Sequence, residues 1–141
     1  MIGIDTNILI YAHRAEFPQH EAARAVVQEL AEGPSPWALP VFVIGEFLRV
    51  VTHPAVLDPP TDRDTACAVV DALLASPSAR LLVPSTRFWS MLRSAIEEGR
   101  VLGNGIFDAQ IVAICREHGV DILLTEDRGL RRFTGIRVQG L

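Results

Sequence analysis

The chain has 141 residues, of which 49% are apolar and 21% are charged, and its formal net charge is −4. This length and composition fit one folded domain over residues 1–141 and exclude a disordered acidic chain. There is no basic segment before an apolar run at the start, and no apolar run of about 18 residues, so we expect no signal peptide and no membrane contact. Two cysteines outside any CxxC pair favour a reduced, cytoplasmic protein.

Short apolar runs bounded by turn residues alternate with helical patterns along the chain. In chain order, the predicted elements are a strand at Ile2–Ile4, helices at Thr6–His13 and Gln19–Ala31, a strand at Trp37–Leu39, helices at Val41–Val51 and Thr61–Ala75, a strand at Arg80–Val83, helices at Ser85–Glu98 and Phe107–His118, and strands at Asp121–Thr125 and Ile136–Val138. Strands that alternate with helices typically form a parallel sheet with crossover helices. We therefore expect an α/β fold, a three-layer α/β/α sandwich around a short, mostly parallel sheet of four or five strands.

Two acidic residues follow predicted strands. Asp5 comes directly after the first strand, and Asp127 comes two residues after Thr125. Open parallel sheets bind their ligands beyond the carboxyl ends of their strands, so both residues are candidates for a site. Either one alone could equally be a helix cap.

Two further acids lie on predicted helices. Glu46 belongs to a helix that is apolar almost all round, so we expect its carboxylate to be largely buried and therefore paired, protonated or bound to a cation. A salt bridge to Arg49, one helical turn away, is the structural alternative. Asp108 opens the helix Phe107–His118, where an acid also stabilises the helix dipole. Asn104, just before it, could cap this helix or point its amide into a site.

Taken together, the four acids indicate a metal site more strongly than any one of them does. Carboxylates that converge without a counterion raise one another's pKa, and a hard divalent cation removes that cost. Mg²⁺ favours a few carboxylates, retained waters and phosphate oxygens, and such a centre can activate water against a phosphodiester. The sequence therefore indicates metal-dependent chemistry at Asp5, Glu46, Asp108 and Asp127.

The motifs around these acids resemble those of PIN-domain nucleases, in the same order along the chain. They are IGIDTN at Asp5, VIGEF at Glu46, FDAQI at Asp108 and LLTEDR at Asp127, and the segment RFTGIRV near the end is also similar. Thr6, Asn7 and Thr125 match the polar neighbours of the acidic quartet. Glu126 competes with Asp127 for the fourth position, and the Thr-x-Asp spacing favours Asp127.

The short stand-alone members of this family are typically VapC-type toxins of type II toxin–antitoxin pairs. The resemblance implies an endoribonuclease that uses Mg²⁺ or Mn²⁺, forms a homodimer and is neutralised by a small VapB-type antitoxin. We expect Asp5 and Asp108 to bind the metal directly, while Glu46 and Asp127 complete the shell or orient the attacking water. Hydrolysis with in-line displacement would leave 5′-phosphate and 3′-hydroxyl ends.

The negative net charge is compatible with an RNA substrate. Without the four site acids, 13 acidic residues balance 13 arginines, and the chain has no lysine. Arginine binds phosphate through a bidentate fork. The candidates for phosphate contacts are Arg14, Arg87, Arg93, Arg100, Arg128, Arg131 and Arg132, although solvated surface charge is the plainer interpretation of any one of them.

Other functions that gather acids at a sheet edge fit less well. A phosphoacceptor signalling domain would need a lysine, a phosphatase of the haloacid dehalogenase type would have an acid where Asn7 stands, and the P-loop motif GxxxxGK[ST] is missing. Two alternatives stay open within the same fold. One is a non-catalytic PIN module that binds RNA or protein, which would be expected to lose quartet acids. The other is a housekeeping or orphan PIN nuclease.

Overall fold

A computed structural model describes all residues from 1 to 141. Its single sheet has five strands, β1 (Ile2–Ile4), β2 (Trp37–Pro40), β3 (Ala79–Leu82), β4 (Ile122–Leu124) and β5 (Arg137–Gln139). The strand order is β3-β2-β1-β4-β5, and every neighbouring pair is parallel. The predicted parallel sheet is confirmed, and the last predicted strand is its edge.

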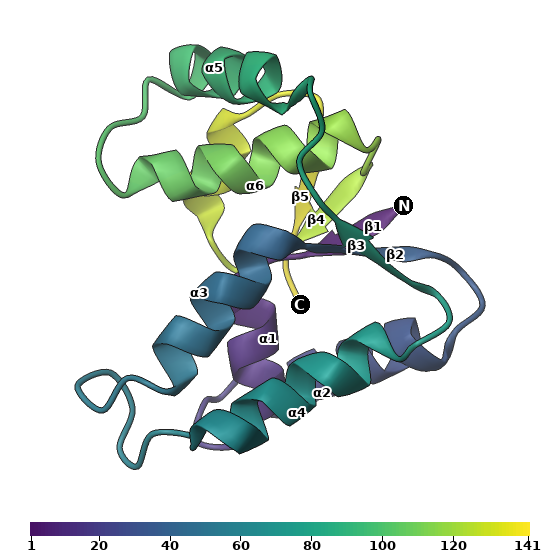
Figure 1. Cartoon of the computed structure of the whole chain (residues 1–141), viewed down its shortest axis with the longest axis vertical. Helices are drawn as coiled ribbons and strands as arrows, with labels where there is room; N and C mark the ends of the chain where they lie inside the picture. Colours follow the sequence, from purple (N-terminus) through teal and green to yellow (C-terminus); the bar gives the residue numbers. More distant parts are fainter.

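Six α-helices and one 3₁₀ helix cover the sheet. They are α1 (Thr6–His13), α2 (His20–Glu32), α3 (Val41–Val51), α4 (Arg63–Leu74), α5 (Phe88–Gly99), α6 (Gly105–Glu117) and η1 (Arg128–Arg132). Helices α5 and α6 lie on one side of the sheet and α1 to α4 on the other, which confirms the α/β/α sandwich (Figure 1). None of these helices combines the length and apolar character that a membrane span requires.

The core lies along the central strands. Ile4 of β1, Trp37 and Leu39 of β2 and Leu123 of β4 are fully buried, and so is most of α6 between residues 111 and 115. Strands buried on both faces are typical of parallel sheets covered by helices. This packing holds β1 and β4 rigidly side by side, with Ile4 opposite Leu124.

The strand order creates a switch point at the carboxyl ends of β1 and β4. The chain winds outward from β1 to β2 and β3, then returns to place β4 on the other side of β1. Asp5 follows β1 and Thr125 follows β4, and the backbone N–H of Asp5 donates to the carbonyl of Leu124 at 3.0 Å. Open α/β sheets bind ligands at such a point.

One predicted boundary differs from the structure by three residues. The helix predicted from Ser85 begins at Phe88. The Ser85 hydroxyl and backbone N–H both bond to the carboxylate of Glu117, at the end of α6. These contacts hold Ser85 outside the helix, and a long-range partner of this kind is invisible in the local pattern.

Candidate active site

Asp5 is the buried centre of the site. It caps α1 from an extended conformation, with one carboxylate oxygen accepting the backbone N–H of Thr6 at 2.7 Å. The other oxygen accepts from Asn7 Nδ2 at 2.8 Å and from Thr125 Oγ1 at 2.6 Å. Asp5 is only 5% exposed, so the predicted strand end carries a fixed carboxylate and not a loose surface cap.

The Asp5 carboxylate is difficult to ionise. Burial raises its pKa from 3.8 to about 6, against the opposing effect of the hydrogen bonds from Thr125 and Thr6. The negative charges of Glu46 and Asp108 raise this pKa further. Three of the four predicted acids are therefore close enough to interact electrostatically. A nearby cation would relieve this cost.

Thr125 links the two central strands at this point. Its hydroxyl donates to Asp5 and accepts from Asn7 Nδ2 at 2.9 Å and from the backbone N–H of Asp127 at 3.0 Å. The side-chain oxygen of Asn7 accepts the backbone N–H of Glu126 at 3.1 Å. The polar residues predicted to support the quartet thus form a hydrogen-bonded frame that positions Asp5 relative to Asp127.

Glu46 does not have the predicted burial. Its side chain is 35% exposed, at the rim of a cleft, and the buried carboxylate is that of Asp5. The prediction was wrong because an apolar helix can still leave one side open, and Gly45 and Arg49 lie on the exposed side of α3. Glu46 accepts a hydrogen bond from Thr6 Oγ1 at 2.7 Å, and Arg49 Nη2 lies 3.8 Å away. The Arg49 pair considered from the sequence is present, but it is loose and solvated.

Asp108 lies in the first turn of α6, as predicted, and it interacts electrostatically with both Glu46 and Asp127. Its pKa is raised by burial and by the charges of Asp127 and Glu46, and it is lowered by Arg132. Asp127 caps η1 by accepting the backbone N–H of Gly129 at 2.7 Å. A Cβ on Gly129 would lie 2.9 Å from Asp127 Oδ1 and 3.0 Å from Arg132 Nη2, so a larger residue here would displace these two side chains.

The structure separates Asp127 from its competitor Glu126. The Glu126 carboxylate accepts the backbone N–H of Leu141 at 2.7 Å, at the carboxyl end of the chain. After burial, the charge of Asp127 is the largest cause of the raised pKa of Asp108, and Glu126 is not among the causes. Asn104 occupies the N-cap position of α6 but makes no side-chain capping bond, and it lines the cleft.

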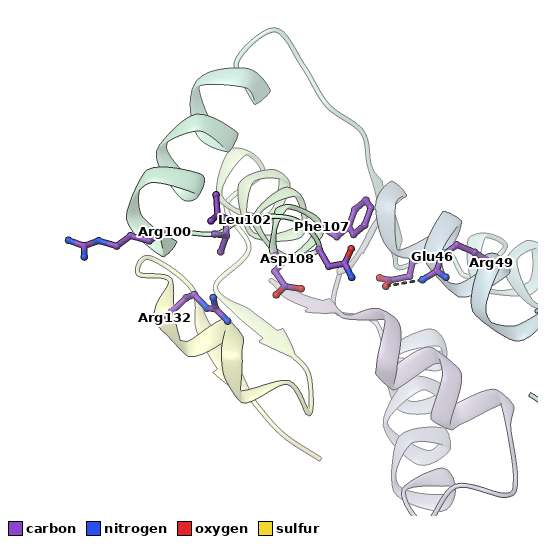
Figure 2. A pocket seen from close by; sticks show the side chains of 10 residues that line it. Glu46, Arg49, Arg100, Leu102, Phe107, Asp108 and Arg132 are labelled. Carbon is purple, nitrogen blue, oxygen red and sulfur yellow. Dashed lines mark ion pairs between the residues drawn. The ribbon is translucent and has the colours of Figure 1, made fainter. Parts of the chain in front are cut away.

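A cleft of about 620 Å³ is lined by two of these acids, Glu46 and Asp108 (Figure 2). Glu46 and Arg49 come from α3 on one wall, Asp108 lies opposite them, and Arg132 approaches Asp108 from η1 (Figure 2). The remaining lining residues are Arg100, Val101, Leu102, Asn104, Gly105 and Phe107. The cleft therefore combines carboxylates that could hold a cation with guanidinium groups that could hold an anion.

Only two of the seven arginines predicted for phosphate binding line this cleft, Arg100 and Arg132. Arg14 is paired with Glu16 at 2.6 Å, and Arg93 Nε donates to Glu97 at 3.1 Å on the surface of α5. Arg87 Nη2 donates to the Glu117 carbonyl at 3.1 Å. The two others, Arg128 and Arg131, line a smaller hollow with Glu126 near the end of the chain. Sequence reasoning missed Arg49 as a cleft residue because it considered Arg49 only as a partner of Glu46.

The carboxylate oxygens of Glu46 and Asp108 in the cleft are ligands that suit a hard divalent cation. No three His, Cys, Asp or Glu side chains in the chain are arranged to hold a metal ion among them. Mg²⁺ commonly binds through one or two carboxylates and keeps several waters, so a preformed set of three is not required. The pKa values of Asp5 and Asp108 are both raised, first by burial and then by neighbouring carboxylates, and a cation bound here would lower both.

Comparison with known proteins agrees with this geometry. Residues 2–136 match the family described as the PIN domain. Ribonuclease VapC43 of Mycobacterium tuberculosis is 39% identical over 137 residues, which cover 97% of this chain and 92% of the relative. Ribonuclease VapC48 of the same organism is 31% identical over 135 residues, which cover 96% of this chain and 93% of the relative.

Solved structures share the fold. VapBC2 from Rickettsia felis, solved bound to a promoter DNA fragment, superposes with a TM-score of 0.69 at 18% identity, covering 99% of this chain and 98% of that one. VapC20 of Mycobacterium tuberculosis, a toxin that cleaves the Sarcin–Ricin loop, superposes with a TM-score of 0.64 at 16% identity, covering 87% of each chain. These two structures show the shared fold. The match along residues 2–136 and the two ribonuclease relatives establish that the chain belongs to the PIN-domain family and, within it, to the VapC group.

Proposed function

We propose that this chain is a metal-dependent endoribonuclease, the toxin component of a type II toxin–antitoxin pair. The observation that carries the proposal is the proximity of Asp5, Glu46, Asp108 and Asp127 at the switch point of the sheet, where neighbouring carboxylates help to raise the pKa values of Asp5 and Asp108. Glu46 and Asp108 line a cleft that also holds the guanidinium groups of Arg49, Arg100 and Arg132. Relatives that cover almost the whole chain are named ribonucleases.

Asp5 and Asp108 are the proposed direct ligands of Mg²⁺ or Mn²⁺. Asp5 is fixed by three hydrogen bonds, and Asp108 projects from the first turn of a largely buried helix, so both carboxylates are held before a substrate arrives. A bound ion would supply charge to the scissile phosphate and lower the pKa of a water molecule.

The remaining acids have positioning roles in this proposal. Glu46 is half-exposed at the cleft wall and can accept a proton from the attacking water or orient it. Asp127 holds the start of η1 and so fixes Arg132 beside Asp108. Water then adds to the phosphorus as the 3′ oxygen leaves in line, which gives a 5′-phosphate and a 3′-hydroxyl end.

Arg132 and Arg49 are the proposed phosphate contacts, one on each side of the carboxylates (Figure 2). Arg132 Nε donates to the Gly129 carbonyl at 2.8 Å, and its guanidinium carbon lies 6.0 Å from the centre of the Phe133 ring. Arg49 has only the loose pair with Glu46, so the Nη donors of both arginines have no hydrogen-bond partner. Their donors therefore remain available to phosphate oxygens.

Cleavage of total RNA, with and without Mg²⁺, tests the proposal. The wild-type chain should cut RNA only with the ion, leaving 5′-phosphate ends that can be mapped by sequencing. Asp5→Asn should keep the wild-type circular dichroism spectrum and lose the cleavage. Full activity of Asp5→Asn at equal purity, or cleavage that chelation leaves unchanged, contradicts the assignment.

We also propose a homodimer and a VapB-type antitoxin as partners. Three apolar side chains outside the cleft, Leu81, Val83 and Trp89, are exposed near the edge strand β3 and the start of α5, and such surface usually meets another protein. Light scattering should give twice the mass of the chain. Co-expression of the small open reading frame expected beside the gene should suppress the RNA cleavage, and a lack of suppression would favour an orphan nuclease.

A further inference from the structure

A second hollow, of about 390 Å³, opens between helices α3 and α6 beside the acidic cleft. It shares Glu46, Arg49 and Phe107 with the cleft, so the two are continuous. The rest of this α3–α6 hollow is lined by Val41, Phe42, Gly45, Gln110 and Ile111. Its volume lies within the range of about 300–1,000 Å³ that is usual for pockets that bury small organic groups.

Phe107 stands at the boundary between the cleft and the hollow. Its side chain is 56% exposed, although it directly precedes Asp108 at the centre of the site. Figure 2 shows its ring beside Asp108, on the side toward α3. An exposed aromatic ring at this place is not needed for the core, and it is available to an incoming group.

On the α3 side of the hollow, Phe42 is held in place by packing, and the space over Gly45 is empty. The ring of Phe42 stacks on Phe88, with centroids 5.4 Å apart and planes inclined by 29°, so Phe42 is held in place. A Cβ built on Gly45 would meet no atom within 4 Å, so space is free over α3. Gln110, one helical turn after Phe107, adds an amide with both donors and an acceptor.

We infer that the α3–α6 hollow binds one unpaired nucleobase of the RNA substrate, next to the phosphate held in the cleft. This inference rests on the proposed ribonuclease function and adds a subsite to it. Bases of single-stranded RNA stack on aromatic rings and expose their edges to amide side chains, which matches Phe107 and Gln110.

The charges at the rim favour a nucleotide over a second copy of the chain. Arg49 lies where the hollow meets the cleft, so a nucleotide could place its phosphate against the guanidinium group and its base against the apolar walls. An apolar protein surface laid here would desolvate Arg49 and Glu46 without offering them partners.

Fluorescence of 2-aminopurine, a base whose emission falls when it stacks, tests the inference. Oligoribonucleotides carry it at each position around the cut, and the protein carries Asp5→Asn so that RNA is bound and not cleaved. We expect quenching at one position only. Phe107→Leu should abolish this quenching and weaken binding by about tenfold to a hundredfold, whereas Phe107→Tyr, which keeps the aromatic face, should retain both.

Gly45→Leu approaches the same subsite from the other wall. Leucine favours the helix more than glycine does, and it would fill the free space over α3, so the fold should be kept while the base is excluded. Val56→Ala, at an exposed apolar residue outside both hollows, is the control and should leave the quenching unchanged.

The outcomes separate the subsite from the proposed function. Wild-type cleavage together with unchanged cut sites and unchanged quenching in Phe107→Leu overturns the subsite alone. Lack of wild-type cleavage with quenching that still depends on Phe107 overturns the ribonuclease proposal and keeps base binding. A dimer that becomes monomeric in Phe107→Leu, with no quenching in the parent, identifies the hollow as an interface between copies and overturns the inference.

Discussion

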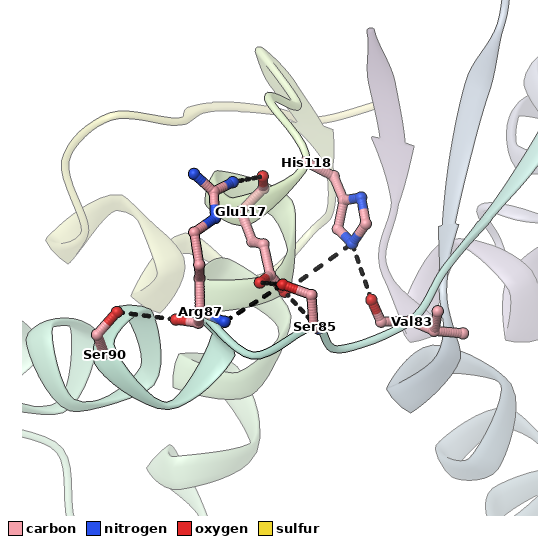
Figure 3. A network of polar contacts seen from close by, with 6 residues as sticks. All are labelled: Val83, Ser85, Arg87, Ser90, Glu117 and His118. Atoms are coloured by element: carbon pink, nitrogen blue, oxygen red, sulfur yellow. Dashed lines mark hydrogen bonds and ion pairs between the residues drawn. The ribbon is translucent and has the colours of Figure 1, made fainter.

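Two largely buried carboxylates, Asp5 and Glu117, accept similar hydrogen bonds, but their pKa values are shifted in opposite directions. Asp5 accepts from the Thr125 hydroxyl and a backbone N–H, and Glu117 accepts from the hydroxyl and backbone N–H of Ser85 (Figure 3). The Glu117 side chain is only 2% exposed, yet its pKa is lowered, first by the Ser85 hydroxyl and also by His118 and Arg87. The pKa of Asp5 is raised to about 6.

The neighbouring charges help to explain the difference. Glu117 has His118 Nε2 at 3.9 Å and Arg87 nearby (Figure 3). Asp5 instead has the carboxylates of Glu46 and Asp108. One carboxylate is satisfied within the fold and fastens the segment before α5 to the end of α6. The Asp5 carboxylate is buried beside other carboxylates, and no basic side chain offsets their charge, so its ionised form is unfavourable. Such perturbed pKa values are typical of functional sites.

The largest difference in activity is expected between two carboxylate-to-amide substitutions, one in the acidic site and one at Glu117. Asp108→Asn should lower kcat for RNA cleavage by at least about a hundredfold, since it removes charge from the reacting centre. Glu117→Gln should keep activity within about twofold and lower the Tm by on the order of 5 °C, because the Ser85 contacts weaken. A turnover assay and calorimetry on both variants check this, and a Glu117→Gln variant that is stable but inactive would break the comparison.

Removing one hydroxyl should make the Asp5 environment still less favourable. Thr125→Val deletes the strongest hydrogen bond that opposes the raised pKa of Asp5 and frees Asn7 and the Asp127 N–H from their partner. We expect kcat to fall by about tenfold and the acidic limb of the pH–rate profile to move to higher pH. Thr125→Ser should restore both, and an unmoved acidic limb in Thr125→Val would contradict the role of this hydroxyl.

The pH dependence of stability should report Asp5 directly. Its folded pKa of about 6 exceeds the ordinary 3.8, so the proton is bound more tightly in the folded state. This contribution is complete below pH 3.8 and is lost as pH rises through about 6, at a cost of up to about 3 kcal/mol.

Thermal melts of the metal-free protein between these pH values check the sign. The Tm should fall more steeply in the wild type than in Asp5→Asn. Added Mg²⁺ should raise the Tm more at about pH 7.5 than at about pH 5, because a cation that binds only the folded, ionised site stabilises it by mass action. Equal Mg²⁺ shifts at both values would show that Asp5 is not part of the ion site.

The smallest effect is expected at the phosphate contacts. Arg132→Gln should raise KM several-fold, leave kcat nearly unchanged and reduce the salt dependence of binding by about one charge. Arg80→Gln is the matched control, because Arg80 lies outside the cleft and donates only to the backbone carbonyls of Pro77 and Ala79. Equal effects of the two substitutions would assign the change to net charge and not to the cleft.

Much of the fold could be predicted because its signals are local. The apolar strand endings at Asp5 and Thr125 indicated which polar residues would meet at the sheet edge, and the structure brings them within hydrogen-bond distance. Helix boundaries were predicted to within two residues, except at the start of α5, where the bonds from Ser85 to Glu117 move the boundary by three.

The predicted site was less complete where a side chain depends on packing between elements. The periodicity of α3 could not show that Glu46 lies on an open side, because that depends on the distance between α3 and α6. The same is true of Arg49 and Phe107, because only the folded structure shows that they line both the cleft and the α3–α6 hollow. Arg14 and Arg87 lie near predicted site loops in sequence but bond elsewhere.

The pairing of β1 with β4 also has a consequence for biosynthesis. Asp5 and Thr125 are separated by 120 positions, and their contact completes the centre. A nascent chain that has emerged only as far as α4 carries Asp5 and Glu46 on folded or folding elements, but it lacks Asp108, Asp127 and the strand that aligns them. The four acids can therefore come together only after β4 and η1 have been synthesised, so the nuclease centre forms at the end of chain synthesis.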